Sequence, residues 1–219
     1  MPIAITDDHL ALGSTAASFL ESHKARAANR DLLEEATEGP APIWHDLVRL
    51  GWLGLALPEA HGGSGYGLAE LVVVVEELGR AVAPGPFVPT VIASATIARA
   101  RDDDQRARHL PGLADGSTIA GVALADGPQL ADGRLDGTAT VLGGGLAGLL
   151  VVACGDDVAL VPSSAPGVAV AVPANIDPSR RTARVTLRRV RMVASAYLRR
   201  AFSRSERQTW LARLSVSPA

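Results

Sequence analysis

Residues 50–89 read LGWLGLALPEAHGGSGYGLAELVVVVEELGRAVAPGPFVP, and this stretch decides the fold. Its apolar run at 53–57 has the composition of a strand and is followed by a glycine-rich loop at 61–67. Apolar residues then recur at helical spacing from Leu68 to Val82, which predicts a helix. Valines also fill the other face of this helix, so we expect it to be buried nearly all round.

Helical periodicity extends on both sides of this stretch, from residue 7 to about 113. We expect Asp7 or Asp8 to cap a first helix that continues as far as Ala27. Pro84 and Pro86 end the helix at 68–82, because proline removes a backbone donor. Further helices are predicted at 43–50, at 89–100 and, from the capping-box spacing of Asp102 and Gln105, at 102–110.

After residue 113 the pattern is that of β-structure. Asp-Gly pairs are turn signals, because both residues tolerate positive φ, and they begin at 115, 126, 132 and 136. Short runs rich in Val, Leu and Ala predict strands at 119–124, 138–142, 149–154, 158–162 and 168–172. The segment 183–188 alternates apolar and polar residues, whereas Val190 and Met192 have the opposite phase, so we expect a bulge or tight turn between them.

The change of pattern divides the chain into an N-terminal helical domain at 1–114, a β domain at 115–192 and a basic tail at 193–219. The tail carries apolar residues, Leu198 among them, that we expect on one face of a short amphipathic helix. Such a basic terminus is interpreted as solvated in preference to a partner-binding segment.

Composition narrows the class of protein. The net charge of −2 gives no reason to expect nucleic acid or an anionic membrane as partner. No apolar run reaches the roughly 18 to 20 residues that a membrane span needs. The single Cys154 excludes an internal disulfide framework, and the first ten residues lack the pattern of a signal peptide. We therefore expect a cytoplasmic protein.

Motifs for chemistry are sparse. Residues 143–148 match G-x-G-x-x-G, but a strand follows where a dinucleotide-binding fingerprint needs a helix, so we interpret them as a β-turn. The five histidines are scattered without the spacing of metal ligands, and Cys154 is expected to be an inert core residue. The residues themselves therefore predict no nucleophile, no general base and no metal site.

Several segments resemble the acyl-CoA dehydrogenase family. The helical half carries the family's pattern at 50–59, 62–65, 76–80 and 84–90, and the β half resembles it more loosely at 135–137, 177–181 and 185–191. The resemblance implies an α+β fold with N-terminal helices and a small central β-barrel. It also implies that the family's C-terminal four-helix domain is absent from this chain.

The resemblance implies chemistry as well. In the family a carboxylate removes the α-proton of an acyl-CoA thioester while FAD accepts the β-hydride. The two flavin-contacting segments correspond here to a loop that contains Leu124, Ala125 and Asp126 and to a segment that contains Leu142 and Gly143. Both lack the hydroxyl groups that the family uses. No catalytic residue is assigned, because the family's base belongs to the C-terminal domain.

The family also places the acyl tail near the loop after the long helix, which here contains Val82, Pro84, Phe87 and Val91. Ordinary core packing is the alternative for each of them. Three interpretations of the chain stay open. It is a subunit of an acyl-CoA dehydrogenase assembly that needs a homo- or hetero-oligomeric partner, a non-catalytic binding protein, or a truncated or frameshifted product.

Overall fold

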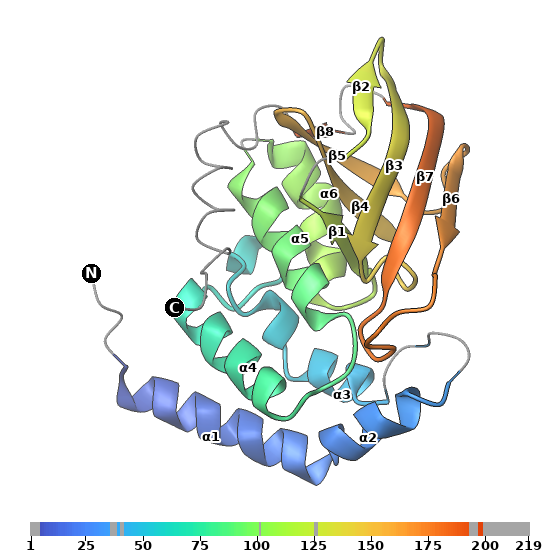
Figure 1. The fold of residues 1–219 in the computed structure, drawn as a ribbon. Helices are drawn as coiled ribbons and strands as arrows, with labels where there is room; N and C mark the ends of the chain where they lie inside the picture. Colours follow the sequence, from blue (N-terminus) through green and yellow to red (C-terminus); the bar gives the residue numbers. More distant parts are fainter. Residues whose placement is uncertain are drawn as a thin grey trace, which may run out of the picture.

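In the computed structural model, the described residues are 5–35, 39, 42–100, 102–124, 127–192 and 197–198. The helical half consists of α1 (Asp7–Ser22), α2 (Ala25–Leu32), α3 (Trp44–Arg49), η1 (Trp52–Gly54), η2 (Glu59–His61), α4 (Leu68–Arg80), α5 (Phe87–Arg99) and α6 (Asp103–Ala114). The second half consists of β1 (Ala120–Ala123), β2 (Gln129–Ala131), β3 (Arg134–Leu142), β4 (Leu149–Cys154), β5 (Asp157–Pro162), β6 (Val168–Ala171), β7 (Thr182–Arg191) and β8 (Tyr197–Leu198). The predicted fold class, helices followed by a curled β-sheet, is confirmed (Figure 1).

The apolar run at 53–57 forms turns instead of the strand that its composition suggested. Gly51, with φ of +71°, starts the 3₁₀ turn η1. The glycine-rich loop then folds back on this run, because the N–H of Tyr66 donates to the carbonyl of Leu55 at 3.0 Å. Gly63 permits this close approach, since a Cβ there would lie 2.1 Å from the Leu57 carbonyl oxygen.

The first predicted helix is divided in two. Thr6, and not Asp7 or Asp8, caps α1 by accepting the N–H of His9 at 3.3 Å. The helix ends before Lys24, whose φ of +50° turns the chain into α2. Ala27 therefore belongs to α2, which departs from the single helix that the periodicity predicted.

Helix α4 is less buried than predicted. Leu71, Val74 and Leu78 are buried. Leu68 and Val72, however, are 70% and 47% exposed. Helix α1 runs beside α4 (Figure 1), and the exposure of Leu68 and Val72 means that part of the α4 surface stays uncovered.

The strands form one sheet in the order β6-β7-β3-β1-β4-β5-β8, with β2 paired to β3. Only β1 and β4 are parallel among the described pairs. Asp132 and Gly133, with φ of +49° and +67°, form the tight turn between β2 and β3. Asp136 and Gly137 do not make a turn as predicted, since they lie inside β3.

The phase change near the end of β7 is a β-bulge, as predicted. The register shifts between Leu135 and Gly137 of β3, so that Arg188 and Arg189 both lie opposite Asp136. Arg189 has φ of +50°, and its backbone N–H donates to the Asp136 carboxylate at 3.0 Å. The bulge keeps Val190 and Met192 on the buried face with Leu187.

Helices and strands share a hydrophobic core. One cluster joins Ile97 of α5 and Leu110 of α6 to Val151 of β4 and Leu160 of β5. Leu198 belongs to the same cluster from β8, so this residue is in a strand and not in the predicted tail helix. Apart from 197–198, the tail at 193–219 lies outside the described residues. The division into domains near residue 114 stays a prediction.

Candidate functional site

The predicted flavin-contacting residues lie where β1 and β3 end against α5. Val122 of β1 pairs with Leu142 of β3, so Leu124, which directly follows β1, lies near the end of β3 that contains Leu142. Both leucines are partly buried against the cluster that contains Ile97 of α5. Ala125 and Asp126 lie outside the described residues. The structure therefore brings together three of the five predicted flavin contacts.

Gly143 fixes how closely α5 approaches this edge. Its φ is +69°, and a Cβ at this position would lie 2.8 Å from Cγ of Pro89, in the first turn of α5. The neighbouring Thr90 is fully buried, and its hydroxyl accepts the backbone N–H of Ala120 at 3.3 Å. Helix α5 is thus held against the sheet by a direct contact at β3 and a hydrogen bond at β1.

These residues do not fit a flavin in the way that the family resemblance requires. Leu124 and Leu142 carry only hydrocarbon side chains, which neither donate nor accept hydrogen bonds. The backbone N–H of Gly143 is already used, because it donates to the Arg181 carbonyl at 3.1 Å. Thr140 lies two residues earlier on the same face of β3 and is exposed, but at about 7 Å from Leu142 it is not at the expected position.

The predicted acyl-contacting residues differ in burial. Phe87 and Val91 are 3% and 5% exposed and belong to the helical core, and Pro84 is buried as well. Val82 is 38% exposed and has φ of +50°, a conformation that β-branched residues rarely adopt. Core packing accounts for three of the four positions, and their contact with an acyl group stays a prediction.

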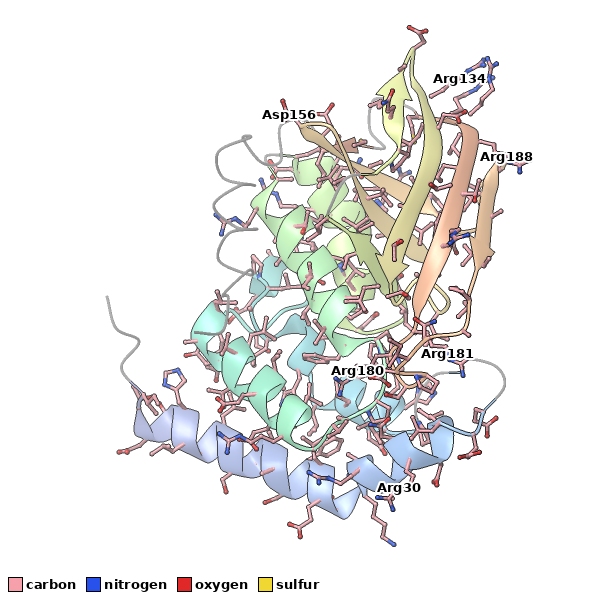
Figure 2. All side chains as sticks on the ribbon, viewed as in Figure 1. Arg30, Arg134, Asp156, Arg180, Arg181 and Arg188 are labelled. Carbon is pink, nitrogen blue, oxygen red and sulfur yellow. The ribbon has the colours of Figure 1, made fainter. Side chains whose placement is uncertain are left out.

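Two arginines link the acyl loop to the flavin edge. They follow one another in the loop between β6 and β7, where Figure 2 labels both. Arg180 donates to the carbonyl of Ala83 at 3.1 Å, and Arg181 donates to the carbonyl of Glu35 at 2.7 Å. The same Arg181 offers its own carbonyl to Gly143. The two predicted sites are therefore neighbours around the start of α5.

Sequence reasoning missed Thr90, Arg180 and Arg181 as residues that shape this region. Arginines that donate to carbonyl oxygens leave no charge pattern, because the acceptor is backbone. The sequence does contain one signal for Thr90. It is a polar residue inside an apolar segment, and a hydroxyl that becomes buried in such a segment needs a hydrogen-bond partner.

The groups with displaced pKa values are not among these site residues. The pKa of Glu70 is lowered by its own backbone N–H and that of Gly67, with His9 adding to the effect. Burial lowers the pKa of His109, and Arg108 lowers it further. In the described part of the chain no Asp or Glu is buried, and no cluster of His, Cys, Asp or Glu has the arrangement of a metal site. No described helix is long and apolar enough to cross a bilayer.

Comparison with known proteins adds to this geometry. Residues 6–117 match a family model described as acyl-CoA dehydrogenase, N-terminal domain. The acyl-CoA dehydrogenase FadE12 of Mycobacterium tuberculosis is 34% identical over 130 residues, which cover 51% of this chain and 33% of that protein. The acyl-CoA dehydrogenase IpdE2 of the same organism is 35% identical over 114 residues, which cover 52% and 35%.

Solved structures match more of the chain. The ChsE4-ChsE5 complex of M. tuberculosis has a TM-score of 0.82 at 26% identity, and the match covers 98% of this chain and 62% of that one. A variant of the Tcur3481-Tcur3483 steroid ACAD has a TM-score of 0.75 at 31% identity, covering 87% and 58%. The chain thus spans about a third of these curated relatives and about three fifths of these solved chains.

Proposed function

The chain belongs to the acyl-CoA dehydrogenase family, and we propose that it acts in the α,β-dehydrogenation of an acyl-CoA thioester only together with a partner subunit. In this proposal the partner supplies both the FAD site and the catalytic base. The present chain supplies the helical scaffold and the loop at Val82.

The observation that carries the proposal is the chemistry of the edge formed by Leu124, Leu142 and Gly143. A flavin bound there would lose a side-chain hydrogen bond at each leucine, and each such loss costs about 1 to 3 kcal/mol. The remaining backbone donor of Gly143 already serves the Arg181 carbonyl. Two losses of this size lower the affinity by roughly one to four powers of ten.

The exposure of the described carboxylates is consistent with the same proposal. A base that removes an α-proton must lie within hydrogen-bond reach of it, in a place where its pKa suits the reaction. Every Asp and Glu in the described residues is exposed or half-exposed. We therefore propose none of the described carboxylates as the base.

Two similar solved structures also support a partner. One is described as a ChsE4-ChsE5 complex and the other as a Tcur3481-Tcur3483 steroid ACAD, so each is named for two components. A family member that leaves the flavin to a second component is consistent with the hydrocarbon side chains at Leu124 and Leu142.

The test is co-expression of the full chain with a full-length family member encoded nearby in the same genome. We expect the two proteins to purify together as a yellow complex that oxidises an acyl-CoA. The matched control is Leu142→Ala in this chain, which should leave the flavin content of the complex unchanged because the partner holds the cofactor. A colourless preparation without a co-purifying homologue would contradict the proposal.

A further inference from the structure

The sheet ends in an exposed strand, β6. Val170 within β6 and Val172, which directly follows it, are each 38% exposed. Ala169 and Ala171 are exposed as well. In Figure 1, β6 forms the side of the sheet away from the helices. No described strand pairs with its outer edge, because β6 pairs only with β7.

The register shows which backbone groups β6 leaves unused. The N–H of Arg188 donates to the Gly167 carbonyl at 2.8 Å, and hydrogen-bonded pairs alternate along an antiparallel ladder. Ala169 and Ala171 therefore bond to β7. Val170 directs its N–H and C=O away from β7, and so does Val172 beyond the end of β6. An added strand would find these groups at the spacing of a normal ladder.

This edge lacks charged side chains and a bulge, two of the features that usually prevent strand pairing. Natural edge strands are protected by charged side chains, prolines or bulges. Residues 165–176 contain no charged side chain, and Pro166 and Pro173 lie outside the four residues of β6. The register of β6 with β7 is continuous from Val168 to Ala171. The edge is therefore open to a further strand.

Charges beside the edge indicate what kind of strand it accepts. Arg184 of β7 lies opposite Ala171, and Arg188 lies opposite Gly167, one step beyond the first register pair. Both arginines are exposed, and no described carboxylate is within ion-pair distance of either. Figure 2 shows the Arg188 side chain beside β6, at this end of the sheet. Ala171 and Gly167, which lie opposite the two arginines, are small and do not cover the outer face of β6.

The distance between β7 and an added strand suits long side chains on both of these strands. An added strand would lie about 10 Å from β7, two strand spacings away. An Arg reaching across Ala171 and a Glu reaching back from the added strand together span this gap. A second copy of this chain fits less well, because its own β6 edge, within residues 165–176, offers no carboxylate to Arg184 and Arg188.

We propose that the outer edge of β6 binds an extended acidic segment of a partner protein as an additional β-strand. Its backbone pairs with Val170 and Val172, and Asp or Glu residues at alternate positions pair with Arg184 and Arg188. Strand addition of this kind derives affinity from main-chain hydrogen bonds and specificity from alternate side chains. The interaction does not depend on flavin binding or on dehydrogenase activity.

The test uses the full chain and two fluorescent eight-residue peptides, one alternating Val and Glu and the other alternating Val and Lys. Fluorescence polarisation should show saturable binding of the Val-Glu peptide and at least tenfold weaker binding of the Val-Lys peptide, about the effect of one charged hydrogen bond. Reversing both charges, with Arg184→Glu and Arg188→Glu, should exchange the preference.

The backbone contact is tested with Val170→Pro. Its missing N–H points away from β7, so the variant should keep its melting temperature while losing the peptide at least about tenfold. Val170→Thr keeps the N–H and is the matched control, expected to bind within about twofold of the wild type. In the unmodified chain, the peptide should slow hydrogen exchange of the Val170 amide, which needs no variant.

Equal affinity for both peptides, or none for either, would overturn the proposal. So would self-association that Val170→Pro abolishes, because the occupant would then be a second copy. A Val170 amide that is protected without peptide at every protein concentration would show that the edge is already paired and would overturn it too.

Discussion

The contact between Gly143 and Pro89 gives a quantitative test of how α5 meets the sheet. Gly143→Ala places a methyl group 2.8 Å from Cγ and 3.4 Å from Cβ of Pro89, at a φ of +69°. The left-handed conformation costs an Ala residue about 1 to 2 kcal/mol. The overlap with a ring on a packed helix adds about 1 to 3 kcal/mol. We expect a loss of roughly 2 to 5 kcal/mol in the free energy of unfolding.

Gly155→Ala is the matched control. Gly155 has φ of +64°, and a Cβ there would have no heavy atom within 4 Å. This variant should therefore lose only the conformational cost of about 1 to 2 kcal/mol. Both variants are compared by urea denaturation. If the slope of the free energy of unfolding against urea concentration is the same for both, a difference in midpoint reports a difference in stability.

The double variant Gly143→Ala, Pro89→Ala separates the contact from strain elsewhere. Removing the ring relieves the overlap, so the double variant should be more stable than the sum of the single losses predicts, by about 1 kcal/mol or more. Equal losses for Gly143→Ala and Gly155→Ala, with additive behaviour in the double variant, would refute the close packing of α5 on the end of β3.

Three further changes are informative. Val82→Gly should raise the free energy of unfolding by about 0.5 to 1 kcal/mol in thermal or urea unfolding, because glycine removes the strain of a β-branched residue at φ of +50°; a loss instead would mean that side-chain packing of Val82 outweighs strain. The folded-state pKa of His109 is lowered by burial and then by Arg108. The free energy of unfolding should therefore fall as the pH decreases through about 6.5. His109→Gln should flatten that part of the profile of urea midpoint against pH. The folded-state pKa of Glu70 is lowered by its own backbone N–H, by that of Gly67 and by His9. The ionised Glu70 carboxylate therefore stabilises the fold above its ordinary pKa, and this stabilisation is lost as the pH falls below that pKa. If Glu70→Gln leaves the acid side of the profile of urea midpoint against pH unchanged, this prediction is contradicted.

Predictions from the sequence were most accurate where a residue pattern is compatible with only one local structure. The opposite phases of Leu187 and Val190 on a strand with one buried face require an extra residue, and the structure has its bulge at Arg188 and Arg189. Strand β4 begins and ends at the predicted residues, because a continuous apolar run between turns can only be buried.

Other features depend on tertiary contacts that leave no local signal. Lys24 has no turn propensity, yet it adopts φ of +50° where α2 turns away from α1. The run at 53–57 looks like a strand, but the glycine loop takes its carbonyls as acceptors and holds it in turns. Arg180 and Arg181 act through backbone carbonyls far away in sequence, so no spacing rule identifies them.

The role of the candidate site stays a prediction, and only the surroundings of its residues can be compared with the structure. The resemblance pointed to Leu142 and Gly143, and the structure places both beside the start of α5, next to the loop of Val82. It did not reveal that the N–H of Gly143 is already engaged by Arg181, because that pairing arises from the register of β3 and β7.

We expect that this chain does not hold FAD by itself. The most direct measurement is isothermal titration of FAD into the purified full chain, with the co-expressed complex titrated after removal of its flavin. We expect no saturable heat from the chain alone and one-site binding by the complex. Stoichiometric binding of FAD by the chain alone, unchanged in Gly143→Ala, would contradict the account.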